Sequence, residues 1–117
     1  MINLKGMIKM ENYPKLDSKE KWKYFNYAFD CNELEKTELL VYLCLLRFCN
    51  SSKGWAYPSH ERIMKCIGVK DKHTITKAIT SLEEKGFIIK INCGIGKNNH
   101  YYFVKKFENY EEDYDDL

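Results

Sequence analysis

Residues 59–104 read SHERIMKCIGVKDKHTITKAITSLEEKGFIIKINCGIGKNNHYYFV, and this stretch decides the fold. Ser59 is a typical first cap of a helix, and Gly68 allows the left-handed backbone that ends one. A second helix is predicted from Asp71 or Lys72 to Lys85, ended by Gly86. The β-branched run 87–91, the glycine-rich turn 94–99 and the run 100–104 then predict a β-hairpin. The expected order is short helix, tight turn, longer helix, β-hairpin.

The longer helix is predicted to have two opposed faces. Ile75, Ala78, Ile79 and Leu82 recur at helical spacing and form the packing face. The opposite face is polar and contains His73, Thr76, Lys77 and Thr80. Such a helix can enter the major groove of DNA, where side chains reach base edges. The candidate recognition residues are Lys70, Lys72, His73, Thr76, Lys77 and Thr80, with Lys70 and Lys72 expected on phosphates and Thr76 and Lys77 near bases.

Two neighbouring segments supply further candidate DNA contacts. The hairpin tip combines glycines, which allow close backbone approach, with positive and amide side chains, and its candidates are Lys90, Asn92, Lys97, Asn98 and Asn99. The amino end of the short helix exposes backbone amides that favour a phosphate, and its candidates are Ser59, His60 and Arg62. A solvated surface without a ligand is the alternative interpretation of each set.

The charge distribution is uneven along the chain. The 117 residues carry 19 basic and 17 acidic groups, a net charge of +2. Residues 1–107 keep all 19 basic groups with 11 acids, a net charge of +8, because six acids lie in residues 108–117. A basic body attracts polyanions such as nucleic acid. The acidic tail is expected to be a solvated solubility tail, a segment that binds a protein partner, or an internal competitor for the DNA surface.

The amino-terminal part is predicted to add an arm and two helices. Residues 1–18 lack a sustained period and are interpreted as a flexible arm, so the folded domain is expected over residues 19–107. The helix 19–29 is rich in aromatic residues, and a homodimer interface is expected at Trp22, Phe25 and Phe29. The next helix, from Glu35 or Lys36, is apolar nearly all round and should be buried on several sides.

Several motifs resemble one family: Tyr57-Pro58-Ser59-His60-Glu61, Ile67-Gly68-Val69, Thr74-Ile75, Ala78-Ile79 and Leu82-Glu83-Glu84-Lys85-Gly86-Phe87-Ile88. In order and spacing they resemble the winged helix-turn-helix family of plasmid and phage replication initiators and mobile-element accessory proteins, over about residues 35–105. The resemblance implies a mainly α fold with a small antiparallel β-hairpin (α+β), a recognition helix from Lys72, and a wing at the hairpin tip. Lys70-Asp71-Lys72-His73 departs from the family pattern by one extra residue and no Ser. Binding led by the helix and binding led by the wing therefore both stay open.

Other classes of protein are disfavoured by composition and motifs. The longest apolar run, 39–46, is far shorter than the ~20 residues of a membrane span, and no secretory signal is visible, so a cytoplasmic protein is expected. The five cysteines and three histidines show no metal-ligand spacing, and no nucleotide-binding or nuclease motif occurs. We therefore expect no metal, no cofactor and no enzymatic activity.

The sequence favours a sequence-specific, double-stranded DNA-binding protein of a mobile element. It would act as a transcriptional regulator or as an accessory factor at a replication or conjugative-transfer origin. A stand-alone protein is expected, since the chain continues little beyond the wing. The alternative is a winged-helix module that contacts a protein partner and does not bind DNA.

Overall fold

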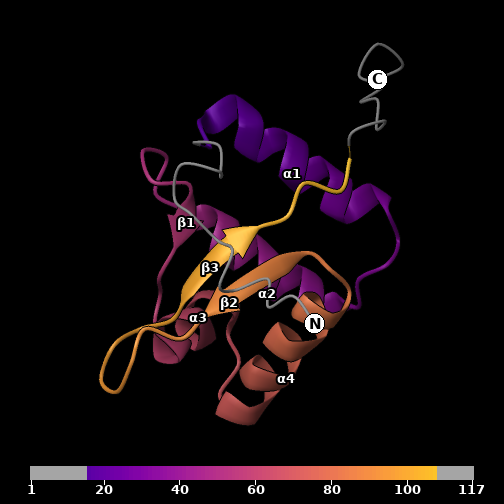
Figure 1. Ribbon diagram of the computed structural model, residues 1–117. Helices are drawn as coiled ribbons and strands as arrows, with labels where there is room; N and C mark the ends of the chain where they lie inside the picture. The colour runs from indigo at the N-terminus through magenta and orange to yellow at the C-terminus, as the bar shows by residue number, and fades with distance from the viewer. Residues whose placement is uncertain (1–15, 108–117) are drawn as a thin grey trace, which may run out of the picture.

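The structure is a computed structural model that describes residues 16–107. The predicted arm, apart from its last three residues, and the predicted acidic tail, 108–117, lie outside the described residues. Four helices and three strands follow one another along the chain (Figure 1). They are α1 (Ser18–Asp30), α2 (Lys36–Arg47), β1 (Trp55–Ala56), α3 (His60–Ile67), α4 (Lys72–Glu84), β2 (Ile88–Ile91) and β3 (His100–Phe103).

Helix α1 begins slightly earlier than the sequence indicated. The Asp17 side chain accepts a hydrogen bond from the Glu20 backbone N–H at 2.9 Å, so Asp17 caps the helix and Ser18 is its first residue. Leu16 is buried in the hydrophobic core. The folded part therefore starts within the segment that was interpreted as an arm, because Leu16 anchors the chain ahead of the cap.

Helix α2 is central and is fixed at its amino end by reciprocal capping. The Glu35 backbone N–H donates to the Glu38 side chain at 2.9 Å, and the Glu35 side chain accepts from the backbone at Glu38. Glu38 is also the acceptor for the Lys85 ammonium at 2.6 Å and for the Ser81 hydroxyl. Burial raises the pKa of Glu38, but these hydrogen bonds outweigh burial and leave the pKa below its usual range. Glu38 is therefore a charged link between α2 and the end of α4.

The three strands form one antiparallel sheet in the order β1-β3-β2. Trp55 pairs with Tyr102 on one side of β3, and Ile88 pairs with Phe103 on the other. The predicted hairpin is confirmed, and the short strand β1 extends it on the β3 side. The sheet lies against the helices, and the hairpin loop projects beyond it (Figure 1).

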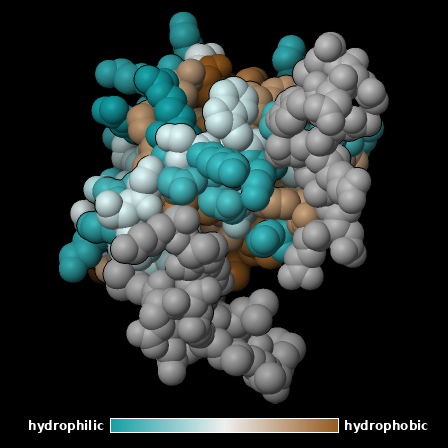
Figure 2. Space-filling view, turned by 90° about the horizontal axis from the view of Figure 1, so that it is seen from above, coloured by the Kyte–Doolittle hydropathy of each residue, from teal (hydrophilic) through white to brown (hydrophobic). Residues whose placement is uncertain are grey.

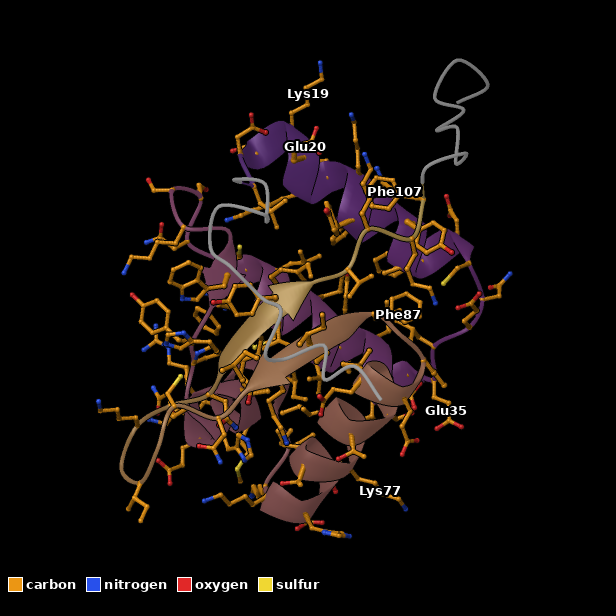
Figure 3. All side chains as sticks on the ribbon, viewed as in Figure 1. Lys19, Glu20, Glu35, Lys77, Phe87 and Phe107 are labelled. Atoms are coloured by element: carbon orange, nitrogen blue, oxygen red, sulfur yellow. The ribbon has the colours of Figure 1, made fainter. Side chains whose placement is uncertain are left out.

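The core lies between the sheet and the helices. Its largest fully buried side chains include Tyr24 of α1, Leu45 of α2, Ile79 of α4 and Tyr101 of β3. Phe107 continues the core past β3, packing edge-on against Tyr24 with ring centroids 4.8 Å apart, and Figure 3 shows it beside α1. A short helix, a tight turn, a longer helix and a β-hairpin on a small sheet make a winged helix-turn-helix, as expected. No helix within residues 16–107 is both long and apolar enough to cross a bilayer.

Candidate nucleic-acid interface

Two helix N-caps and one glycine at a helix C-terminus shape the α3–α4 segment. The Ser59 hydroxyl accepts from the Arg62 backbone N–H at 3.1 Å and caps α3. Gly68 ends α3 with φ +73°, a left-handed conformation that residues with a Cβ rarely adopt. Asp71 then caps α4 through the His73 N–H at 3.1 Å and the Thr74 hydroxyl at 2.8 Å. Helix α4 therefore begins at Lys72, as predicted.

Helix α4 has the two predicted faces. Ile75, Ala78, Ile79 and Leu82 are buried in the core, and this prediction is confirmed. The opposite face is solvent-exposed and contains Lys72, His73, Thr76, Lys77 and Thr80, while Lys70 is exposed in the turn before it. Figure 3 shows Lys77 extending from α4 away from the sheet. These side chains are therefore positioned to meet a ligand.

The wing tip, residues 92–99, projects from the same end of the molecule as the amino end of α4 (Figure 1). Gly94 and Gly96 have φ of +110° and +77°, which makes the sharp turn possible. Lys97 is exposed and its ammonium has no partner within residues 16–107. The tip therefore presents backbone and one positive charge to the solvent.

The asparagines of the wing have structural hydrogen bonds. Asn92 Oδ1 accepts from the Gly94 backbone N–H at 2.9 Å. Asn98 Nδ2 donates to the Tyr57 carbonyl at 3.0 Å, and Asn99 Nδ2 donates to the Tyr101 hydroxyl at 3.5 Å. Asn98 ties the tip to the segment that leads into α3. These bonds help to hold the wing, and the ligand contacts predicted for the three asparagines stay predictions.

Lys90 lies on β2, back from the tip. It is half-buried, its ammonium is 3.8 Å from the Glu83 carboxylate, and its backbone N–H donates to the same side chain at 3.4 Å. The predicted wing set is therefore not one cluster. Lys97 is at the tip, whereas Lys90 faces the end of α4, because strand pairing fixes its position on the sheet.

The amino end of α3 lies between the wing and α4. His60 is half-buried, and its Nε2 lies 3.4 Å from the Tyr101 hydroxyl. Burial, followed by the charges of Lys72 and Lys90, holds the pKa of His60 below its ordinary value of 6.5. The lowered pKa disfavours the charged form of His60, and its contact with a phosphate stays a prediction.

Arg62 is the positive charge at this end of α3. Its guanidinium lies 4.9 Å from the centroid of the Phe48 ring. A surface hollow of about 320 Å³ adjoins it, lined by Phe48, Tyr57, Pro58, Ser59, Arg62 and Asn98. The hollow joins α3 to the base of the wing, so Arg62 and the wing belong to one continuous surface.

We call this surface the basic edge, defined by Arg62, Lys70, Lys72, Lys77 and Lys97. None of these five has an ion pair within residues 16–107. Elsewhere in residues 16–107, Lys85, Lys106 and Lys23 form ion pairs with Glu38, Glu33 and Glu20, whereas the exposed Lys19, Lys36 and Lys65 form none. Positive charge on the basic edge is therefore available to an anion.

The aromatic residues of α1 divide between two sides of the helix. Tyr24 and Ala28 are buried against the core. Trp22 and Phe29 are 59% and 48% exposed, and Phe25 lies between them, 5.0 Å from each ring centroid. A hollow of about 310 Å³ beside Trp22 and Phe25 is completed by residues of α1 and α2, including Leu43 and Leu46. The three residues predicted at a dimer interface thus share an outer surface.

One exposed residue of the wing was not among the candidates from sequence. Ile95 at the tip is fully solvent-exposed, with a relative exposure of 105%. Its position between two glycines was the available signal, because an apolar residue at a glycine-rich tip has nothing of its own chain to pack against. The five cysteines are free thiols, and within residues 16–107 no three metal-ligating side chains gather.

Comparison with known proteins agrees with this architecture. Residues 32–88 match the family model described as a helix-turn-helix domain, a segment that runs from before α2 to the first residue of β2. No curated protein and no solved structure matches the chain. Helix-turn-helix domains characteristically place their second helix in the DNA major groove. Residues 32–88 are therefore similar to helix-turn-helix domains, which indicates DNA binding, and the described chain folds as a winged helix-turn-helix.

Proposed function

We propose that the protein binds double-stranded DNA in a sequence-specific manner, with α4 in the major groove and the wing on the neighbouring backbone or minor groove. The observation that carries the proposal is the basic edge: five cations, supplied by α3, the turn, α4 and the wing, that form no ion pair with any residue between 16 and 107. Phosphate neutralisation by these groups supplies most of the affinity, and the exposed face of α4 supplies sequence choice.

A protein-contact module is the second candidate, since a polar helix can also dock a partner. The amino-terminal half of the exposed face of α4 favours DNA, because Lys72, His73 and Lys77 lie there while the exposed acid of this face, Glu84, is at the carboxyl end of the helix. The capping Asp71 is engaged with His73 and Thr74. A surface of this kind complements a polyanion. We propose a binding role without catalysis.

Charge reversal separates the two candidates. Lys77→Glu is expected to reduce DNA affinity most if α4 leads binding, and Lys97→Glu if the wing leads. Lys19→Glu is the matched control, because Lys19 is exposed on α1 at the far end of the molecule from α4 (Figure 3). Gel-shift titration of each variant is the measurement. Unchanged binding for both Lys77→Glu and Lys97→Glu would favour the protein-contact module.

Within the DNA-binding class, we propose a regulator or an accessory factor at a replication or transfer origin of a plasmid or phage. The support is the resemblance of the motifs between Tyr57 and Ile88 to proteins of mobile elements. Footprinting of the protein on its own locus tests this role. Protection of a promoter would support regulation, and protection of origin repeats would support the accessory role.

We also propose that the protein acts as a homodimer through the outer surface of α1. Trp22 and Phe29 are exposed, Trp22 and Phe25 line a hollow with largely apolar walls, and large exposed aromatics are common in protein interfaces. Figure 2 views the molecule from the α1 side, where hydrophobic surface shows between hydrophilic side chains. Sedimentation velocity of the protein and of Trp22→Glu tests the proposal. A monomeric wild type at all concentrations, or an unaffected dimer in Trp22→Glu, would contradict it.

A further inference from the structure

The threonine hydroxyls of α4 are all engaged within the helix. Thr76 Oγ1 donates to the Lys72 carbonyl at 3.2 Å, and Thr80 Oγ1 donates to the Thr76 carbonyl at 3.0 Å. Thr74 Oγ1 donates to the Asp71 carboxylate at 2.8 Å. Each hydroxyl has one proton, so none of these side chains retains a donor for a base edge.

Thr76 and Thr80 differ from Thr74 in where they lie. Both are exposed, four residues apart, on the face that also contains His73 and Lys77, whereas Thr74 is half-buried at the side of the helix. Because their hydroxyl protons are committed to the backbone, what Thr76 and Thr80 offer a ligand is a methyl group and an oxygen that can only accept.

That pair of properties matches an A·T base pair in the major groove. Thymine is the one base that presents a methyl group there, and adenine presents an amino donor beside it. Guanine presents two acceptors, which these threonines cannot satisfy and which would need a lysine donor. Cytosine presents an amino donor but no methyl group, so only the A·T pair matches both properties of the threonines in the middle of α4.

We propose that Thr76 and Thr80 select A·T base pairs by packing their methyl groups against thymine 5-methyl groups. This specificity rests on the proposed function, since it requires α4 in the major groove. Lys72 and Lys77 supply charge on either side of the pair, so sequence choice and electrostatic affinity come from different side chains of one helix.

The test pairs a methyl group on the protein with a methyl group on the DNA. Duplexes that bind the full-length protein are selected from a random-sequence library, then synthesised with thymidine or deoxyuridine, which lacks the 5-methyl group. Affinities are measured for the wild type, for Thr76→Ser and Thr80→Ser, which keep the hydroxyl and lose the methyl, and for Thr76→Val, which keeps a methyl and loses the hydroxyl. Thr74→Ser is the matched control, and circular dichroism checks that each variant folds.

For wild type, each contacted thymidine replaced by deoxyuridine is expected to weaken binding about fourfold, the effect of one buried methyl group. Thr76→Ser is expected to lose a similar factor on thymidine DNA and little more on deoxyuridine DNA, whereas Thr76→Val and Thr74→Ser stay near wild type. If replacing thymidine by deoxyuridine weakens binding by the same factor in wild type, Thr76→Ser and Thr80→Ser, the inference is overturned, while DNA binding itself stands. Absence of binding to any duplex would overturn the proposed function as well.

Discussion

Salt dependence of DNA affinity is the most direct consequence of the basic edge. Each phosphate neutralised by a lysine or arginine releases condensed counterions, so the logarithm of affinity falls with the logarithm of salt by about 0.9 per contact. If all five cations of the basic edge contact phosphate, the slope is about −4.5, and affinity falls about 500-fold between roughly 50 and 200 mM salt. The assay is fluorescence anisotropy of a labelled duplex over that range.

Single substitutions locate the contacts. Lys72→Ala and Lys97→Ala are each expected to make the slope shallower by about 0.9. Lys19→Ala should leave the slope unchanged, because Lys19 lies on the opposite side of the molecule from α4 (Figure 3). A slope near zero for wild type, or an equal change for Lys19→Ala and Lys72→Ala, would refute the assignment of affinity to the basic edge.

Three further predictions follow from individual side chains. Glu38→Ala removes the acceptor of the Ser81 and Lys85 hydrogen bonds, so the free energy of unfolding should fall by about 2 kcal/mol in chemical denaturation and the Tm by about 10 °C. Glu33→Ala, at an exposed acid, should change both little. Equal losses in the two variants would contradict the role of Glu38 in joining α2 to α4. The lowered pKa of His60 means that the unfolded chain binds its proton more readily, so stability present at neutral pH should decline as pH falls through 6.5, and less steeply in His60→Gln. An identical decline in the variant would exclude His60. Ile95→Asn should reduce DNA affinity in gel-shift titrations, because apolar side chains of minor-groove binders pack between base steps. The Tm should not change, because Ile95 is fully exposed in the described structure. Unaltered affinity would remove Ile95 from the interface.

Local signals in the sequence predicted most of the fold correctly. The helix caps at Ser59 and Asp71 and the helix end at Gly68 depend on residues only a few positions apart, so they can be predicted from the sequence. The same is true of the periodic face of α4 and of the hairpin. The exposed cations of α4 and the turn also followed from periodicity, because a buried face defines the exposed one.

The partners of individual side chains could not be predicted from the sequence, because these contacts join segments far apart in the chain. His60 was interpreted as a phosphate ligand, and only the structure shows that its Nε2 lies 3.4 Å from the hydroxyl of Tyr101, 41 residues later. Asn98 was interpreted as a wing contact, and only the structure shows that its amide also donates to the carbonyl of Tyr57. Trp22 and Tyr24 look alike in a list of aromatics, and only the packing of α1 decides which is exposed.

The sequence by itself determined the order of elements, the polar face of α4 and the excess of positive charge, since each depends on residues close together in the chain. Tertiary structure alone decided which cations remain without partners and which polar groups hold the wing. The physical reason is that a hydrogen bond or ion pair forms only when folding brings its two groups within about 3 Å, and that distance is a property of the packed chain.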